Sequence, residues 1–216
     1  MMEKKPIVIT LSRQMGSGGS FIGYSAAKEL GFQYIDREIL RQAAERLGTD
    51  AGALEYLDER SAGFLETLMK GFSFGMPEIS VPLPQSRPVD HRELFAMECK
   101  IMNEIAGRYN AVIVGRAGFY ALKDRPEVIR VFIHAPKEFR VERIMKSKKN
   151  NNIREVQAIV KESDHIRAKF IRDMAGVDWM DTRNYHLSID SSVVDFPVII
   201  EMIVKLAVKK SVSEKG

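Results

Sequence analysis

The order of elements at the start of the chain constrains its fold more than any other feature of the sequence. Residues 6–11, PIVITL, form an apolar run rich in β-branched residues, which is typical of a strand buried on both faces of a parallel sheet. A glycine-rich turn, residues 16–19, follows. Apolar residues then recur at helical spacing between residues 21 and 30, and Gly31 is a natural helix stop. Strand, glycine turn and helix in this order predict the opening of an α/β unit.

The same alternation continues along the chain. Four more short strands are predicted, at residues 32–35, 111–114, 128–134 and 185–189. Helices are predicted at about 39–47, twice between 50 and 71, at 91–108, from Pro136, at 152–174 and at 197–208. Such alternation indicates a parallel sheet covered by helices on both faces. With 216 residues, 45% of them hydrophobic, the chain 1–216 is predicted to be one domain, in which the proline-rich segment 72–90 is a mobile loop.

Composition narrows the cellular setting and the partners. The chain has no apolar run near the roughly 20 residues that cross a bilayer and no secretory leader, so we expect a cytoplasmic protein without a membrane partner. The single cysteine, Cys99, excludes an internal disulfide and a cysteine-based metal cluster. Positive charge is concentrated between Lys137 and Arg154, although the net charge is only +4. No series of aromatic residues accompanies this stretch, so nucleic-acid binding is the least favoured interpretation.

The turn from Arg13 to Ser20 is a candidate phosphate-binding site. Its backbone N–H groups and the start of the next helix could hold a phosphate chain, and glycines let the backbone come close. The segment matches G-x-x-x-x-G-K-[ST] only in part, because Arg13 stands at the first glycine and Gly19 at the lysine. Arg13 is therefore the candidate replacement for the missing cation. Ser20 is a candidate magnesium ligand or a helix N-cap, and a tight turn without a ligand is the alternative for the whole segment.

Arginines are predicted to gather at the same edge of the sheet, because ligands of parallel α/β sheets bind beyond the carboxyl ends of the strands. Arg116 follows the third strand and suits a phosphate or carboxylate, unless it forms a salt bridge with Asp36 or Glu38. Arg37 and Arg41 follow the second strand, where they either meet an acceptor phosphate or belong to a solvated helix face.

Two further pairs of charged residues lie one helical turn apart. Arg140 and Arg143 share one helix face, as do Asp164 and Arg167 farther along the chain. A lid that closes over a transferring phosphoryl group would use such cations. An ordinary charged helix surface is the alternative.

Six segments of the chain resemble the cytidylate kinase-like family of P-loop nucleoside monophosphate kinases. They are ITLSRQMGSGG, FQYIDREIL, VIVGRAGFYAL, RVFIHAPKEFRVERI, SDHIRAKF and NYHLSIDSS, in order from residue 9 to residue 192. The resemblance implies a three-layer α/β/α sandwich with strand order 2-3-1-4-5 and a helical lid at about residues 140–175. It also implies a kinase that moves the γ-phosphoryl group of ATP, bound with Mg²⁺, to CMP or dCMP.

The resemblance carries roles to individual positions of this chain. Donor binding is implied for the turn and for a loop near the adenine: Gly16, Ser17, Gly18, Gly19, Ser20, Asp190 and Ser191. Acceptor binding is implied for Asp36, Arg37 or Arg41, Arg116 and Asp164. The catalytic charge is implied for Arg13, Arg116, Arg140, Arg143 and Arg167, and the metal contact for Ser20. We therefore expect Arg116→Ala to lower turnover with little effect on folding.

The chain departs from the well-studied cytidylate kinases at two functional positions. Those enzymes have the P-loop lysine where this chain has Gly19, and an aspartate that helps to read cytosine where it has Ala117. Two alternative functions follow from these departures. One is a kinase for a different small acceptor, and the other is a nucleotide sensor that binds ATP and transfers little.

Overall fold

The structure is a computed structural model that describes residues 5–36, 91–148 and 152–213. Several sequence-based predictions lie outside the described residues. They are the helices between residues 39 and 71, the loop 72–90 and the candidate acceptor contacts Arg37 and Arg41.

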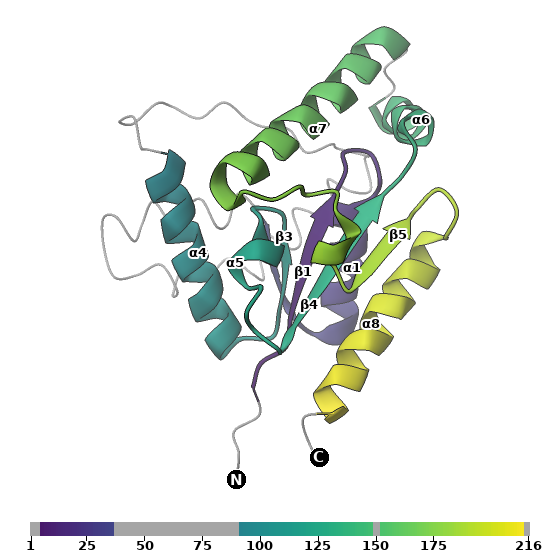
Figure 1. The fold of residues 1–216 in the computed structure, drawn as a ribbon. Helices are drawn as coiled ribbons and strands as arrows, with labels where there is room; N and C mark the ends of the chain where they lie inside the picture. Colours follow the sequence, from purple (N-terminus) through teal and green to yellow (C-terminus); the bar gives the residue numbers. More distant parts are fainter. Residues whose placement is uncertain (1–4, 37–90, 149–151, 214–216) are drawn as a thin grey trace.

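A five-stranded parallel sheet forms the centre of the molecule (Figure 1). Its strands are β1 (Val8–Arg13), β2 (Gln33–Ile35), β3 (Ala111–Val114), β4 (Val128–His134) and β5 (Leu187–Asp190). Their spatial order is β2-β3-β1-β4-β5, which confirms the order implied by the family resemblance. The register sets Leu11 of β1 beside Val114 of β3 and Val131 of β4. The carboxyl ends of these strands therefore meet at one edge of the sheet.

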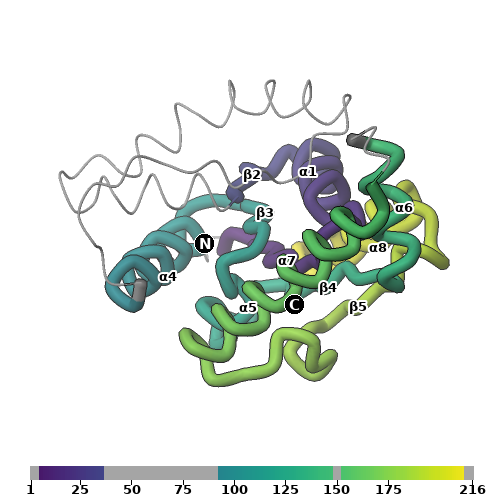
Figure 2. Tube along the Cα trace, turned by 90° about the horizontal axis from the view of Figure 1, so that it is seen from above, coloured from purple at the N-terminus to yellow at the C-terminus, as the bar shows by residue number. Residues whose placement is uncertain are grey.

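Helices cover both faces of this sheet (Figure 2). They are α1 (Gly19–Leu30), α4 (His91–Arg108), α5 (Gly118–Ala121), α6 (Lys137–Lys148), α7 (Ile153–Ala175) and α8 (Phe196–Ser213), with a 3-10 helix, η1 (Thr182–Asn184). On one face α1 and α8 pack together, and Ile22 and Ile199 share a core cluster with Leu11. On the other face lie α4 and α5, where Ile101 and Ile113 share a second cluster. The predicted three-layer sandwich is therefore confirmed.

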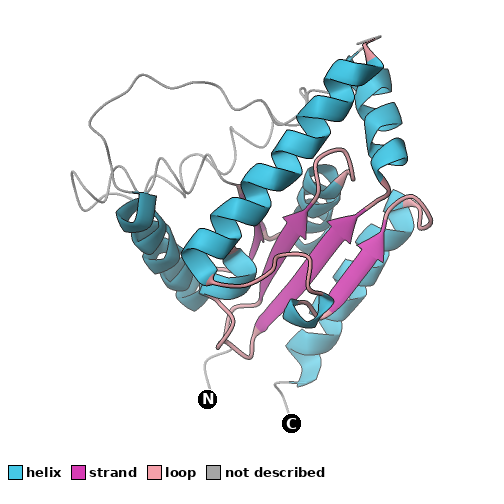
Figure 3. Ribbon diagram, turned by 45° about the horizontal axis from the view of Figure 1, so that its top comes forward, coloured by secondary structure: helices cyan, strands magenta, loops and turns pink. Residues whose placement is uncertain are grey.

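The helices α6 and α7 form a hairpin that crosses above the carboxyl ends of the strands (Figures 1 and 3). Near the glycine turn, Met15 is buried in an apolar cluster with Val141 of α6 and Val156 of α7. Near the other end of α7, Ile171 joins an aromatic cluster that includes Phe132 of β4. The hairpin is therefore packed against both the turn and the sheet.

Sequence periodicity predicted the bounds of some helices and strands and missed others. The strands β3 and β4 and the helix α4 have the predicted bounds. Gly31 ends α1 with a φ of +66°, and the N–H of Phe32 donates to Ala27 O at 2.8 Å, as the predicted glycine stop requires. β1 begins and ends two residues later than predicted, so Arg13 is its last residue. α5 was not predicted, because four residues are too few to show a helical period.

Within the described part of the chain, no helix combines the length and the apolar character needed to span a membrane.

Candidate functional site

Two left-handed glycines shape the turn between β1 and α1. Gly16 and Gly18 have φ values of +84° and +85°, a region that favours glycine. A Cβ on Gly16 would lie 2.8 Å from the carbonyl oxygen of Arg140. A Cβ on Gly18 would overlap the ring of Phe196 and lie 2.6 Å from its Cε2. The turn therefore needs glycine at both positions, because Arg140 of α6 and the ring of Phe196 of α8 pack directly against the backbone.

Two serines near the turn use their hydroxyl groups inside the protein. Ser17 Oγ lies 2.8 Å from Gln14 O and 3.3 Å from Ile133 O. Ser191 Oγ lies 2.7 Å from Ser17 O and 3.1 Å from His134 O. Both serines are buried. Their side chains therefore tie the turn to the ends of β4 and β5. The backbone N–H groups of the two serines are also engaged, because Ser17 N donates to Gln14 O at 3.3 Å and Ser191 N donates to His134 O at 2.9 Å.

Replacing Ser191 tests this anchoring role. Ser191→Ala removes the single hydroxyl proton that Ser17 O and His134 O share, while Ser191 N still donates to His134 O at 2.9 Å. We therefore expect the free energy of unfolding to fall by about 1–3 kcal/mol. Urea denaturation measures this change. Ser192→Ala is the matched control, because the Ser192 hydroxyl bonds to Asp190 within its own loop and should contribute less. Unchanged stability together with weaker ATP binding would instead indicate that the Ser191 hydroxyl contacts the nucleotide.

Arg13 and Ser20 lie on opposite sides of the turn and meet. Arg13 Nε donates to Ser20 Oγ at 3.3 Å. This places a guanidinium group beside the first turn of α1, whose leading N–H groups have no carbonyl partner within the helix. A hydroxyl oxygen has two lone pairs, so the contact with Arg13 is compatible with Ser20 as a magnesium ligand. The left-handed glycines, the helix start and this hydroxyl together fit a phosphate chain with its metal ion.

Arg116 follows β3 in an uncommon conformation and is held by two side chains. Its φ is +50°, and the next residue, Ala117, has a φ of +52°. Arg116 Nε donates to Glu98 Oε2 at 2.6 Å, and the same oxygen forms an ion pair with Nη2. The guanidinium carbon lies 4.5 Å from the centre of the Phe170 ring of α7. Arg116 thus links α4, β3 and α7 at the edge of the sheet where the carboxyl ends of the strands lie.

The partner of Arg116 differs from the salt-bridge partners considered in the sequence analysis. Glu98 lies in α4 and is fully buried, with 0% exposure. Its position falls on the apolar face of that helix, between Leu94 and Ile101 and in line with Ile105. A lone carboxylate on an apolar helix face signals a buried cation, because an unpaired buried charge is strongly unfavourable. The sequence contained this signal, and sequence reasoning missed it.

Arg140 is built into the protein rather than turned toward solvent. Only 4% of the residue is exposed. Its guanidinium group donates to Ala135 O at 2.9 Å, to Met15 O at 3.1 Å and to both carboxylate oxygens of Asp164 at 2.9 and 3.3 Å. Arg140 and Asp164, which the resemblance implied as phosphate and acceptor contacts, therefore bind each other and join α6, α7 and the turn.

Arg143 and Arg167 contact other groups than Arg140 does. Arg143 Nη1 donates to Gly16 O at 3.3 Å, and its guanidinium carbon lies 4.9 Å from the centre of the Phe196 ring. Burial lowers the pKa of Arg143, although an arginine stays charged at neutral pH. Arg167 donates to Ser163 Oγ one turn earlier in α7. Arg143 therefore stands directly at the turn.

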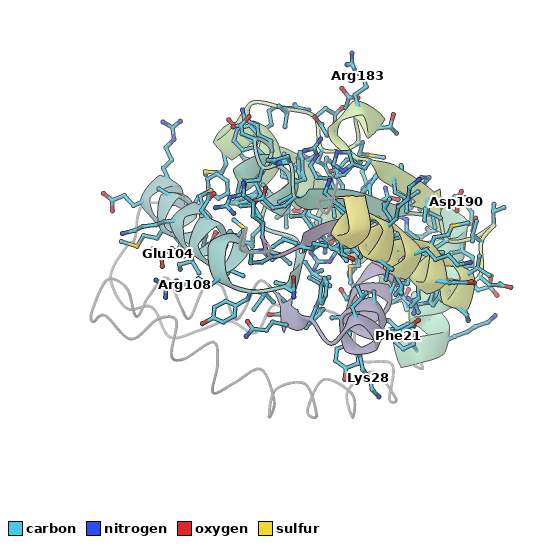
Figure 4. All side chains as sticks on the ribbon, turned by 90° about the horizontal axis from the view of Figure 1, so that it is seen from below. Phe21, Lys28, Glu104, Arg108, Arg183 and Asp190 are labelled. Atoms are coloured by element: carbon cyan, nitrogen blue, oxygen red, sulfur yellow. The ribbon has the colours of Figure 1, made fainter. Side chains whose placement is uncertain are left out.

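Two predicted carboxylates lie at the outer strands. Asp36 follows β2 and is partly buried. Asp190 ends β5, and its Oδ1 accepts hydrogen bonds from Ser192 N at 2.8 Å and Ser192 Oγ at 2.7 Å. Burial raises the pKa of Asp190, but the two bonds from Ser192 and the nearby His134 outweigh it, so the pKa lies below its ordinary value. Arg183 of η1 is not among the candidate site residues, and its side chain projects away from the molecule (Figure 4).

Solved structures with the same architecture come from several proteins. One is an uncharacterized protein from Eubacterium ventriosum ATCC 27560, with a TM-score of 0.67 and 20% identity over 93% of this chain and 98% of that chain. Another is a gluconokinase from Sinorhizobium meliloti 1021, with a TM-score of 0.53 and 14% identity over 99% of this chain and 98% of that chain. At such identities these similarities show the fold alone.

Sequence comparison identifies the family. No curated protein matches the chain significantly. The family model described as "Cytidylate kinase-like family" matches residues 8–193, from the start of β1 to just beyond β5. The matched range includes the glycine turn, the Gly115-Arg116 pair and the hairpin of α6 and α7. This chain therefore belongs to the cytidylate kinase-like family.

Proposed function

We propose that this protein is an ATP-dependent nucleoside monophosphate kinase, with CMP or dCMP as the favoured acceptor. Its family membership supports a phosphotransferase of this class. The observation that carries the proposal is the turn itself, where Gly16 and Gly18 are left-handed and stand directly before α1. Arg13 and Arg143 flank this turn. Backbone amides with two guanidinium groups beside them suit a polyphosphate chain.

The proposed reaction needs alignment and charge compensation, with no covalent intermediate on the protein. An oxygen of the acceptor phosphate attacks the γ-phosphorus of ATP while the bond to the bridging oxygen breaks, and ADP leaves with that oxygen. The acceptor is already an anion, so no general base is required. Mg²⁺, when bound, neutralises charge on the donor phosphates, and Ser20 would hold it. Arg143 and Arg167 would meet the charge of the transferring group.

The hairpin of α6 and α7 is proposed to be the lid of a single domain. Arg140 and Asp164 are hydrogen-bonded to each other, and Arg140 also donates to Met15 O in the turn. We assign this pair to positioning the hairpin over the turn. Arg143, which lies at the turn, and Arg167, which lies one helical turn after Asp164 in α7, are the arginines proposed to touch phosphate.

The acceptor is proposed to lie between β2 and β3, close to Asp36 and Arg116. Glu98 balances the charge of Arg116. Arg116 is therefore better suited to donate hydrogen bonds to the acceptor than to neutralise a phosphate dianion by itself. Ala117 has no side-chain acceptor for the amino group of cytosine, so acceptors other than CMP fit the same position.

A panel of acceptors with ATP·Mg²⁺ tests the proposal. We expect ADP to form fastest with CMP or dCMP, with the corresponding diphosphate appearing in equal amount by chromatography. Faster transfer to UMP, AMP, GMP or a phosphate-free small molecule would overturn the CMP assignment. The absence of the lysine at Gly19 favours a second candidate, the nucleotide sensor. That candidate predicts thermal stabilisation by ATP without transfer to any acceptor.

A further inference from the structure

The side chain of Arg13 and the missing side chain of Gly19 occupy the same space. A Cβ on Gly19 would overlap the Cβ of Arg13 and lie 3.0 Å from its Cγ. It would also lie 3.3 Å from Cδ2 of Leu11 on the same strand. The overlap with Arg13 is strongly repulsive, whereas the contact with Leu11 needs that side chain to move by only a few tenths of an ångström. A residue with a Cβ at position 13 therefore excludes a residue with a Cβ at position 19, whatever the two side chains are.

Gly115 provides the space for the other end of Arg13. A Cβ on Gly115 would overlap Nη1 of Arg13 and lie 3.4 Å from its Cζ. Gly115 also has a φ of +86°, and its N–H donates to Leu11 O at 3.0 Å as β3 ends. With Nε on Ser20 and Nη1 against Gly115, the guanidinium group bridges the start of α1 and the end of β3.

The motif G-x-x-x-x-G-K-[ST] has the opposite arrangement at these two positions, with glycine first and lysine before the final Ser/Thr. In this chain the segment reads R-Q-M-G-S-G-G-S. Both differences from the motif therefore fall on the two residues whose side chains exclude each other. Two independent substitutions would have no reason to form such a pair.

We propose that Arg13, Gly19 and Gly115 are a mutually dependent set that moves the phosphate-binding cation from the first turn of α1 to the last residue of β1. The identity of the ligand, a nucleoside triphosphate, rests on the proposed function. The dependence of the three residues on one another rests on their packing. A guanidinium group is always charged and has five donors in a planar fork, so it can contact two phosphate oxygens at once. The guanidinium group of Arg13 lies between Ser20 of α1 and Gly115 at the end of β3.

Four variants test the dependence and the position of the cation. They are Gly19→Lys alone, Arg13→Gly alone, Arg13→Gly with Gly19→Lys, and Arg13→Ala with Gly19→Lys. The last two differ by a single methyl group at position 13. Because that methyl is the overlapping atom, the Arg13→Ala double variant is a matched control for the Arg13→Gly double variant. Thermal melting with and without ATP·Mg²⁺ gives the stability and the nucleotide response of each.

We expect Gly19→Lys alone to lower Tm by at least about 5 °C. Arg13→Gly alone should keep the fold and lose most of the ATP-dependent rise in Tm. Arg13→Gly with Gly19→Lys should melt within about 2 °C of Arg13→Gly and regain that rise. Arg13→Ala with Gly19→Lys should stay as unstable as Gly19→Lys. If Gly19→Lys proves insoluble, Gly19→Ala gives the same comparison with the smallest side chain.

Two results would overturn the inference. One is a Gly19→Lys protein that melts like the wild type. The other is an equal Tm and an equal ATP response of the two double variants. Neither readout requires phosphoryl transfer, so failure of the acceptor panel leaves this test intact. Conversely, a wild type that phosphorylates CMP while both double variants behave alike would contradict only the coupling between positions 13 and 19.

Discussion

The Arg116→Ala variant should lose about 3–5 kcal/mol of stability together with most of its turnover. Arg116 is the ion-pair partner of Glu98, and the Glu98 side chain has 0% exposure. Removing the guanidinium group leaves a buried carboxylate without its compensating charge. The ring of Phe170 also loses a cation at 4.5 Å from its centre. The expectation from sequence, lower turnover with little effect on folding, omitted this pair.

A second substitution separates the loss of stability from the loss of turnover. Arg116→Ala combined with Glu98→Gln removes the unpaired charge while keeping the shape of the glutamate side chain. Urea denaturation should show that the double variant recovers at least half of the lost stability. Turnover with ATP and CMP should stay about 100-fold below the wild type, because the hydrogen-bond donor at the acceptor position is still missing. Recovery of turnover along with stability would show that Arg116 acts only through folding.

The backbone at position 116 does not complicate this comparison. Arg116 has a φ of +50°, and both arginine and alanine are strained there to a similar degree. The difference between the variants therefore reports on the side chain and its partner.

The high pKa of Cys99, raised to about 11 by burial and by the neighbouring Glu98, keeps that thiol neutral at physiological pH in the wild type. Cys99 therefore packs as an uncharged residue beside the pair.

The sheet could be predicted from the sequence because its strands are buried on both faces. The strand β3 is an uninterrupted apolar run, and β4 is apolar except at Arg130 and His134, so their short length separates them from a helix. The order of the strands could not be derived from periodicity. It came from the family resemblance, which assigned β3 rather than β2 to the place beside β1.

The candidate site was predicted in position better than in contacts. The glycine turn and Arg116 were placed correctly at strand ends, since ligands of parallel sheets bind there. The inward direction of the Ser17 and Ser191 hydroxyls was not predictable, because hydrogen bonds to backbone carbonyls depend on how β4 and β5 approach the turn. The ring of Phe196 against Gly18 was missed for a similar reason, because it joins residues that are distant in sequence.

Arg140 and Arg143 share one sequence pattern but have different contacts in the structure. Their i, i+3 spacing puts both on one face of α6, and the sequence gives no reason to treat them differently. The packing separates them. Arg140 binds Asp164 with two hydrogen bonds and also reaches the carbonyl of Met15. Arg143 has one hydrogen bond of 3.3 Å to Gly16 and an aromatic ring beneath it.

We therefore expect Arg140→Ala to act mainly on stability and Arg143→Ala mainly on turnover. Arg140→Ala removes a buried cation from Asp164, whose side chain is 24% exposed, and should lower the free energy of unfolding by about 3–5 kcal/mol. Arg143→Ala should cost about 1 kcal/mol, from the lost ring contact, while lowering turnover about 100-fold.

Asp164→Asn provides the control for Arg140, because it removes the charge of the partner and keeps its size. Urea denaturation of Arg140→Ala, Asp164→Asn and the double variant should give a coupling free energy of at least about 1 kcal/mol between the two positions. If Arg140 instead contacted phosphate, its loss would lower turnover at unchanged stability, and the coupling with Asp164 would vanish. The measured ratio of stability loss to rate loss thus decides which arginine of α6 positions the hairpin and which one meets the transferring phosphoryl group.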